Sequence, residues 1–216
     1  MSSAQRGPAI LKGAFVSVSD SGGTQALPFQ YNPSDIKRNL QPQMVGGEEQ
    51  DRSRAVRFKG APTQTIDATV EFDAASGLDT GDATAEQYGV YAQLAALELL
   101  ASPSTSVIND MHSKLSSGVM EVAPMTAPNL YFVWGPSRVL PVRLNSYSIT
   151  EELFDGNLNP IRVSVAVNMR VLNYSDLDSS NHAYQRYMVY QQTMESIASK
   201  AYGDISTTGV NSSVFN

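Results

Sequence analysis

The 216-residue sequence contains no cysteine and only two histidines, His112 and His182. The absence of cysteine excludes disulfides, thiolate catalysis, cysteine-ligated zinc and iron–sulfur clusters. The histidines lie in separate polar segments, and neither belongs to a His-x-His or His-Glu-x-x-His pattern, so we interpret them as solvated surface residues. We therefore expect no metal site and no cofactor.

The sequence also lacks a phosphate-binding loop, a Gly-x-Gly-x-x-Gly turn and a Gly-x-Ser-x-Gly nucleophile elbow. The acidic doublets Glu48-Glu49 and Glu151-Glu152 form no carboxylate pair by themselves, because neighbouring residues of a strand point to opposite faces. Asp176–Ser180 begins like a calcium loop, but Asn181 and Tyr187 stand where the turn glycine and the bidentate glutamate belong. We expect no enzyme; a hydrolase with an unfamiliar site is an alternative.

Charge is scarce: charged residues make up 17% of the chain, and the formal net charge is −6. Such an acidic chain gains nothing from counterion release on nucleic acid and is a poor ligand for anionic membranes. No apolar run approaches the roughly 18 residues that cross a bilayer. Met1–Pro8 runs into only a brief apolar stretch broken by Lys12, so we expect no signal peptide. A surface rich in uncharged polar groups suits a protein that packs against neighbours.

Alternation of apolar and polar residues predicts strands. It is strictest in Arg162–Val171 and recurs in Thr65–Phe72. Leu130–Trp134 and Arg138–Thr150 flank a short turn and predict a hairpin, in which the apolar register shifts after Asn145-Ser146 and indicates a bulge. Further strand candidates are Ile10–Val18 and Leu27–Tyr31.

Two helices are predicted. Thr84 and Gln87 form a capping-box pattern, and apolar residues then recur at helical spacing until Ser102-Pro103. These residues include Tyr88, Tyr91 and Leu94, which we expect in the core. A second helix is expected over Ala183–Ala201, before a polar tail that frays.

Two polar connections, Lys37–Arg57 and Ser102–Pro128, are interpreted as long loops, the second with one helical turn near Val107–Leu115. The pattern predicts a mainly β, α+β fold: about six mostly antiparallel strands in a barrel or sandwich, with one helix between strands three and four. We divide the chain into a β domain, residues 1–174, and a C-terminal helical extension, residues 175–216.

Ordered strings in the sequence carry a family resemblance. They are Leu27–Pro33, Glu86–Val90 with Leu94–Glu98, Leu130–Gly135, Pro141–Leu144, and Ile149–Asp155 with Leu158–Arg162. In this order and spacing they resemble the tube-type baseplate proteins of contractile injection systems, the phage-tail-like particles. The resemblance covers roughly residues 9–174.

A second resemblance lies at the C-terminus. Tyr187–Val189, Thr193–Ala198 and Ala201–Asp204 look like the first half of a LysM motif, although Gln191-Gln192 replaces its usual Gly-Asp. The second helix and closing strand of that motif are missing. We therefore expect a degenerate remnant whose helix docks onto a neighbouring baseplate subunit; an ordinary C-terminal helix and a LysM-like peptidoglycan- or glycan-binding module are the alternatives.

The tube resemblance implies an antiparallel β-barrel or sandwich of the phage-tail inner-tube type, similar to that of type VI secretion, with a flanking helix. It implies a homo-hexameric ring that initiates the tube in the baseplate, between the spike hub and the inner tube ring. Other baseplate subunits are further implied partners, and catalysis is not implied. The implied location is a phage-tail-like particle assembled in the cytoplasm, with its release left open.

Ring formation would use open sheet edges, whose main-chain groups can pair with the next subunit. The mixed charges of the Lys37–Arg57 segment suit a contact between rings, although a solvated loop is the alternative. The residues expected at subunit or ring interfaces are Phe29, Tyr31 and Asn32 for fold and edge, Arg52, Arg54 and Arg57 for contact between rings, and Tyr202 and Asp204 for baseplate docking.

Overall fold

Seven strands form one antiparallel sheet in the computed structural model, which describes residues 10–19, 22–45, 57–118, 127–203, 205–208 and 212–215. The strands are β1 (Ala14–Val18), β2 (Thr24–Pro28), β3 (Ile36–Val45), β4 (Arg57–Asp73), β5 (Asn129–Val133), β6 (Val139–Phe154) and β7 (Pro160–Val171). Their order across the sheet is β2-β1-β5-β6-β7-β4-β3. The predicted mainly β, antiparallel fold is confirmed.

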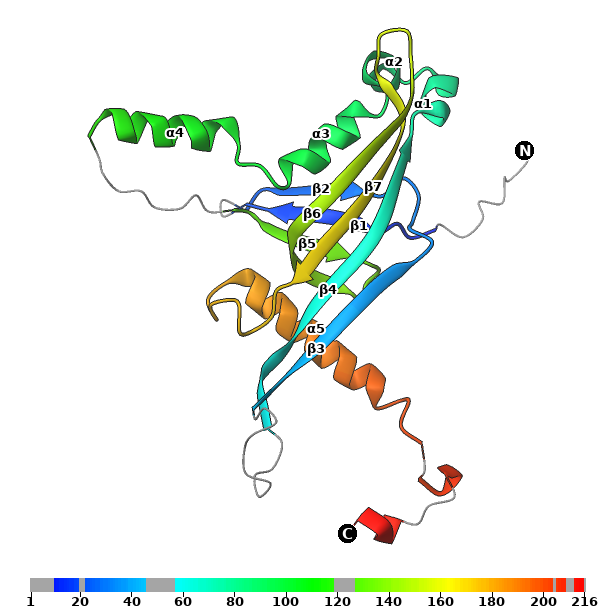
Figure 1. The fold of residues 1–216 in the computed structure, drawn as a ribbon, viewed down its shortest axis with the longest axis vertical. Coiled ribbons are helices and arrows are strands. Elements are labelled where there is room, and N and C mark those ends of the chain that lie inside the picture. Colours follow the sequence, from blue (N-terminus) through cyan, green and yellow to red (C-terminus); the bar gives the residue numbers. More distant parts are fainter. Residues whose placement is uncertain are drawn as a thin grey trace, which may run out of the picture.

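The long strand β6 joins two parts of the sheet. Its first residues pair with β5, which confirms the predicted hairpin, and it pairs with β7 from Val142 to Phe154. The register shifts between Leu144 and Ser146, where the sequence predicted a bulge. Figure 1 shows the short strands β1, β2 and β5 running across the long, twisted strands β3, β4, β6 and β7.

Five α-helices and two short 3₁₀ helices accompany the sheet in the described residues. They are α1 (Ala75–Thr80), α2 (Ala83–Tyr88), α3 (Tyr91–Leu99), α4 (Thr105–Ser116), α5 (His182–Ala198), η1 (Ile205–Thr208) and η2 (Ser212–Phe215). Four of the α-helices lie between β4 and β5, where one was predicted. The prediction of a C-terminal helix is confirmed by α5.

The prediction of a single helix from Thr84 onward is wrong, because the helix is interrupted between α2 and α3. Gly89 takes a left-handed φ of 59°, and Val90 N–H donates to the Pro160 carbonyl, 2.9 Å away. The helix also begins earlier than predicted, since the Asp82 carboxylate, and not Thr84, caps α2 by accepting from the Thr84 N–H at 2.8 Å.

The prediction of a loop over Lys37–Arg57 is also wrong in its first half, because these residues form β3. Nearly every residue of β3 is exposed, so the strand has no apolar face that could produce an alternating pattern. A full helix, α4, replaces the single helical turn predicted within the second loop.

One face of the sheet carries the core. Alternate residues of β4 and β7 are buried there, among them Ile66, Val70 and Val165, and the opposite residues are more exposed. Leu94 and Leu97 of α3 and Tyr187 and Tyr190 of α5 complete the same cluster, so these two helices cover this face. The predicted core position of Leu94 is confirmed.

Tyr88 and Tyr91 were wrongly expected in the core: they are 44% and 49% exposed. The break at Gly89 ends the helical spacing that would have placed them on the buried face with Leu94. Aromatic packing instead occurs between strands, where Phe15, Phe29 and Phe132 lie together and Trp134 stacks on Phe132 with ring centroids 6.0 Å apart.

Candidate assembly surfaces

Two strands of the sheet, β2 and β3, have a neighbour on one side only within the described residues. Each therefore presents main-chain N–H and C=O groups along a free edge. Nearly all residues of both strands are exposed. Pro42 interrupts the β3 register, with shifts on both sides of Gln43, and proline has no N–H to donate. The part of β3 that could pair regularly with a neighbouring chain is therefore Ile36–Gln41.

The face opposite the core is polar. Lys37, Asp67, Asn168 and Ser146 form one row across β3, β4, β7 and β6. In this row Asn168 Nδ2 donates to Asp67 Oδ1 at 2.6 Å, and Asn145 Nδ2 donates to Asn168 Oδ1 at 2.8 Å. A shallow groove of about 320 Å³ follows the same row. Such hydrogen-bonded polar side chains can face water or a polar neighbour.

Apolar side chains are exposed at the end of β6 and in the turn that leads to β7. Leu153 and Leu158 have positive φ angles of 56° and 65°, which cost energy for any residue with a Cβ. They are 60% and 81% exposed, and Phe154 between them is 52% exposed. These exposed leucines were not among the residues singled out from the sequence.

Asp155 holds this turn together. Its carboxylate accepts from the main-chain N–H groups of Asn157 and Asn159, both at 2.8 Å, and from Asn159 Nδ2 at 2.9 Å. The side-chain bond from Asn159, followed by the main-chain bonds, lowers the pKa of Asp155. Asn159 Nδ2 also donates to the Gln87 carbonyl at 3.1 Å, so the turn is fastened to α2.

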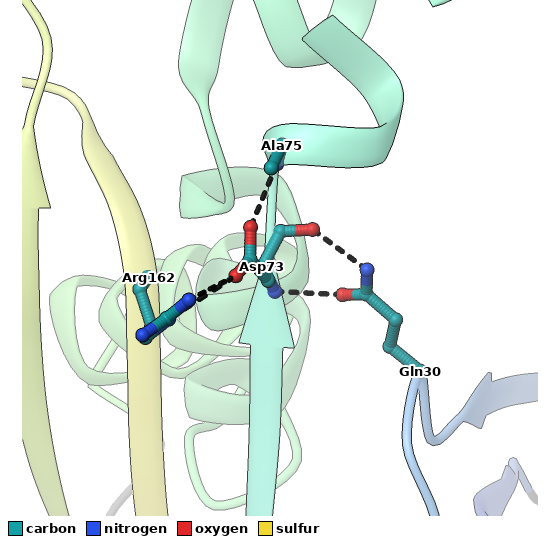
Figure 2. Close-up of polar contacts among 4 residues, drawn as sticks. All are labelled: Gln30, Asp73, Ala75 and Arg162. Atoms are coloured by element: carbon teal, nitrogen blue, oxygen red, sulfur yellow. Dashed lines mark hydrogen bonds and ion pairs between the residues drawn. The ribbon is translucent and has the colours of Figure 1, made fainter. Parts of the chain in front are cut away.

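Asp73 links four parts of the chain at the end of β4 (Figure 2). Its carboxylate accepts from Arg162 at 2.9 Å and from the Ala75 N–H at 2.7 Å. The Ala75 bond is the largest cause of its lowered pKa, and Arg162 comes next. The Gln30 side chain donates to the Asp73 carbonyl at 2.6 Å and accepts from its N–H at 2.8 Å.

Gln30 lies inside the Leu27–Pro33 string but was not among the predicted site residues. Two other residues of that string, Phe29 and Asn32, make contacts within the fold. Phe29 is fully buried, and its ring lies 5.2 Å from that of Phe15. Asn32 accepts from the Gly13 N–H at 2.8 Å and donates to the Leu11 carbonyl at 2.9 Å. Only Tyr31, 52% exposed, offers a large apolar side chain to a neighbour.

The remaining predicted interface residues do not lie with this string. Arg57 is the exposed first residue of β4. Tyr202 follows α5 and is 83% exposed. Arg52, Arg54 and Asp204 lie outside the described residues. The interface role of every predicted site residue stays a prediction.

Helix α5 is fastened to the edge strand β3 by a polar contact that the sequence did not indicate. Arg38 Nη2 donates to the Tyr190 hydroxyl at 3.1 Å. Tyr187 packs beside Tyr190 and Tyr174, with ring centroids 6.3 Å and 6.2 Å away, and burial raises its pKa. The Arg38–Tyr190 bond thus ties α5 to the strand that forms one free edge of the sheet.

No acidic or histidine cluster of the described residues could hold a metal ion. In the same residues, none of the helices has the length and apolar character needed to cross a membrane.

Comparisons with known proteins identify one family. The model of a family described as "Contractile injection system tube protein" matches residues 14–179, which run from β1 past the end of β7. No curated protein matches the chain. A solved structure titled "Tail of empty GTA particle computed with helical refinement, C6 symmetry" is similar over 74% of this chain and 90% of that chain, with 8% identity and a TM-score of 0.29. A likeness at that TM-score supports no argument about this chain.

Proposed function

Because the chain belongs to the contractile injection system tube protein family, we propose that it forms a hexameric tube-initiator ring in the baseplate, which connects the spike hub to the inner tube ring. Its role is structural, and catalysis has no part in it. The particle assembles in the cytoplasm, and the other partners of the ring are further baseplate subunits. Nucleic acid and membranes are not partners.

The observation that carries the ring proposal is the open sheet with β2 and β3 as its edges. A ring requires two different surfaces of one chain that meet head to tail and close. Two free strand edges at opposite ends of one sheet meet that requirement. β2 has five residues, and the part of β3 before Pro42 has a similar length, so the two edges match.

The experiment on this contact uses proline at two adjacent positions of β3, Asn39→Pro and Leu40→Pro. Successive residues of an edge strand direct their N–H groups to opposite sides, so one variant loses an N–H that faces the neighbour and the other loses an N–H that faces β4. We expect the variant whose lost N–H faces the neighbour to stay folded but to lose rings, as measured by mass photometry. The variant whose lost N–H faces β4 should have a lower melting temperature.

The control for these variants is wild-type protein at the same concentration, and thermal unfolding separates lost assembly from lost folding. Rings that persist in both variants would show that the β3 edge is not the contact between subunits.

The C-terminal extension, residues 175–216, has a separate part in the proposal: it docks onto a neighbouring baseplate subunit as a LysM remnant. The 83% exposure of Tyr202 supports this assignment, since a large aromatic side chain in water is available to a partner. The alternative, a glycan-binding module, rests on the sequence resemblance alone. Retention on purified cell wall that is lost in Tyr202→Ala would favour it.

A further inference from the structure

Helix α3 is apolar on every side, although its outer side is uncovered within the described residues. Gln93 and Glu98 are its only amide and charged side chains, and its inner side is buried in the core. On the outer side Tyr91 and Leu99 are 49% and 62% exposed. A helix that is apolar all round is normally buried, so the outer side of α3 has the composition of a contact surface.

The residues of this outer side form a regular row. Tyr91, Ala95 and Leu99 follow one another at intervals of four and therefore lie along one side of the helix. Ala92 and Ala96 lie beside them, and such small side chains allow a second helix to approach closely. Helix α4 does not fill this place: Figure 1 shows it pointing away from the sheet, and none of its residues is buried.

Helix α3 lies at one free edge of the sheet. It packs against the edge strand β2, and Leu27 of β2 packs on the same core as α3. In the proposed ring this edge meets β3 of the next copy. An element that the next copy carries beside its β3, on the core face of the sheet, would therefore come next to α3.

Helix α5 is such an element. The bond between Arg38 of β3 and Tyr190 marks the place where α5 meets β3 on the core face. The helix then continues over Gln191–Ala198, which corresponds to about 12 Å at the usual rise per residue. Figure 1 shows this C-terminal part of α5 extending past β3.

The end of α5 has one apolar and basic side. Ile197 is 50% exposed, and the exposed Lys200 lies on the same side, because its N–H bonds back to the Ile197 carbonyl at 3.1 Å in a tight turn. Glu195 comes two positions before Ile197 and so points roughly the opposite way. Its carboxylate accepts from Gln191 Nε2 at 3.3 Å.

We propose that the end of α5 of one copy packs across the junction of β3 and β2 onto the outer side of α3 of the next copy. Ile197 lies against Tyr91 and Leu99, and Lys200 lies opposite Glu98, which is seven residues after Tyr91 and therefore on the same side of α3. This contact rests on the proposed ring. It names the neighbour onto which the C-terminal extension docks: the next copy of this chain.

The size of the contact shows that it supplements the strand pairing. At roughly 200 Å² for each large side chain, the exposed fractions of Tyr91, Leu99 and Ile197 give roughly 300 Å² of apolar surface. This is far below the roughly 1,200 Å² of a stable interface. The helices therefore strengthen each junction of the ring and fix its register, without holding two copies together alone.

The test uses disulfide trapping in the full chain, which has no cysteine of its own. Leu99→Cys and Ile197→Cys are placed in separate, differently tagged chains, which are co-expressed and oxidised. A disulfide requires Cα atoms within about 7 Å. We expect a disulfide between the two kinds of chain. A single chain that carries both substitutions should give a ladder of linked chains up to six.

The matched control pairs Leu99→Cys with Glu195→Cys, whose thiol lies on the opposite side of α5, and we expect it to form disulfides at least tenfold more slowly. All three positions are exposed, and the melting temperature of each variant verifies folding.

A charge exchange tests the pair formed by Lys200 and Glu98. Glu98→Lys and Lys200→Glu should each raise the concentration at which half of the chains are in rings, by roughly two- to fivefold for a partly exposed ion pair. The two substitutions together should restore assembly. Asp110→Lys makes the same charge change as Glu98→Lys at an exposed residue of α4 and should leave assembly unchanged.

The outcomes separate this contact from the ring itself. Rings in which the 99–197 pair reacts no faster than the 99–195 pair would overturn the contact and leave the ring standing. The contact is also overturned if the double charge variant assembles no better than the single ones. Disulfides between chains that never form rings would support the contact and overturn the ring, and the absence of both would overturn both.

Discussion

Among the glycines of the described residues, Gly89 leaves the least room for a Cβ, and its replacement tests how the β6–β7 turn is held. A Cβ at this position would collide with the carbonyl oxygen of Pro160, to which Val90 donates. The backbone also has φ 59° and ψ −128°, a conformation that side chains rarely allow. Gly89→Ala therefore combines backbone strain with a steric clash against a main-chain atom.

The cost follows from these two parts. Strained backbone costs about 1 to 3 kcal/mol, and forcing an extra group into a packed site costs about 1 to 3 kcal/mol more. We expect Gly89→Ala to lower the free energy of unfolding by about 2 to 6 kcal/mol, measured by urea denaturation. For a chain of this size that corresponds to a fall in melting temperature of roughly 4 to 24 °C.

Two other glycines separate the contributions. Gly81 also has a positive φ, 69°, but a Cβ there would meet nothing closer than the Glu86 carboxylate at 3.8 Å, so Gly81→Ala should cost only about 1 kcal/mol. A Cβ at Gly156 would have nothing within 4 Å, and Gly156→Ala should be nearly neutral. Equal losses in Gly89→Ala and Gly81→Ala would refute the close approach to Pro160.

Two further predictions concern stability. Asp73→Asn should lower the free energy of unfolding by about 1 to 2 kcal/mol at pH 7, because a carboxylate bonded to Arg162 and Ala75 is replaced by a neutral amide. The folded pKa of Asp73 lies below 3.8, so its stabilisation is present above that pH and is lost as the pH falls through the folded pKa. Urea titrations of both proteins should converge in acid; a gap that stays constant from pH 6 to pH 2.5, roughly spanning this transition, would contradict the assignment. Phe29→Ala should lower the free energy of unfolding by about 3 to 5 kcal/mol because the ring is fully buried. Tyr31 is half exposed, so Tyr31→Ala should leave the melting temperature nearly unchanged. Similar losses of stability in the two variants would contradict the different burial of their side chains.

The parts of the fold that the sequence predicted are those buried on one face. β4 and β7 alternate because one face packs on α3 and α5 while the other meets water, and alternation is visible without a structure. The edge strand β3 is exposed on both faces, so nothing in its pattern separates it from a loop. The break at Gly89 depends on Pro160, far along the chain, and helical spacing cannot reveal it.

At the candidate surfaces, too, the sequence indicated local features but not contacts between residues that are far apart along the chain. The string around Phe29 and Asn32 was found from its residues, although its contacts turn out to be internal. The bonds between Gln30 and Asp73 join residues 43 positions apart, so no local pattern could indicate them.

The most direct measurement of the central claim is electron microscopy of the purified full-length chain, classified without imposed symmetry. The account predicts closed rings with six subunits, in which β2 of each copy lies against β3 of the next. Particles in which both strands remain exposed to solvent, or in which other surfaces join the subunits, would contradict it.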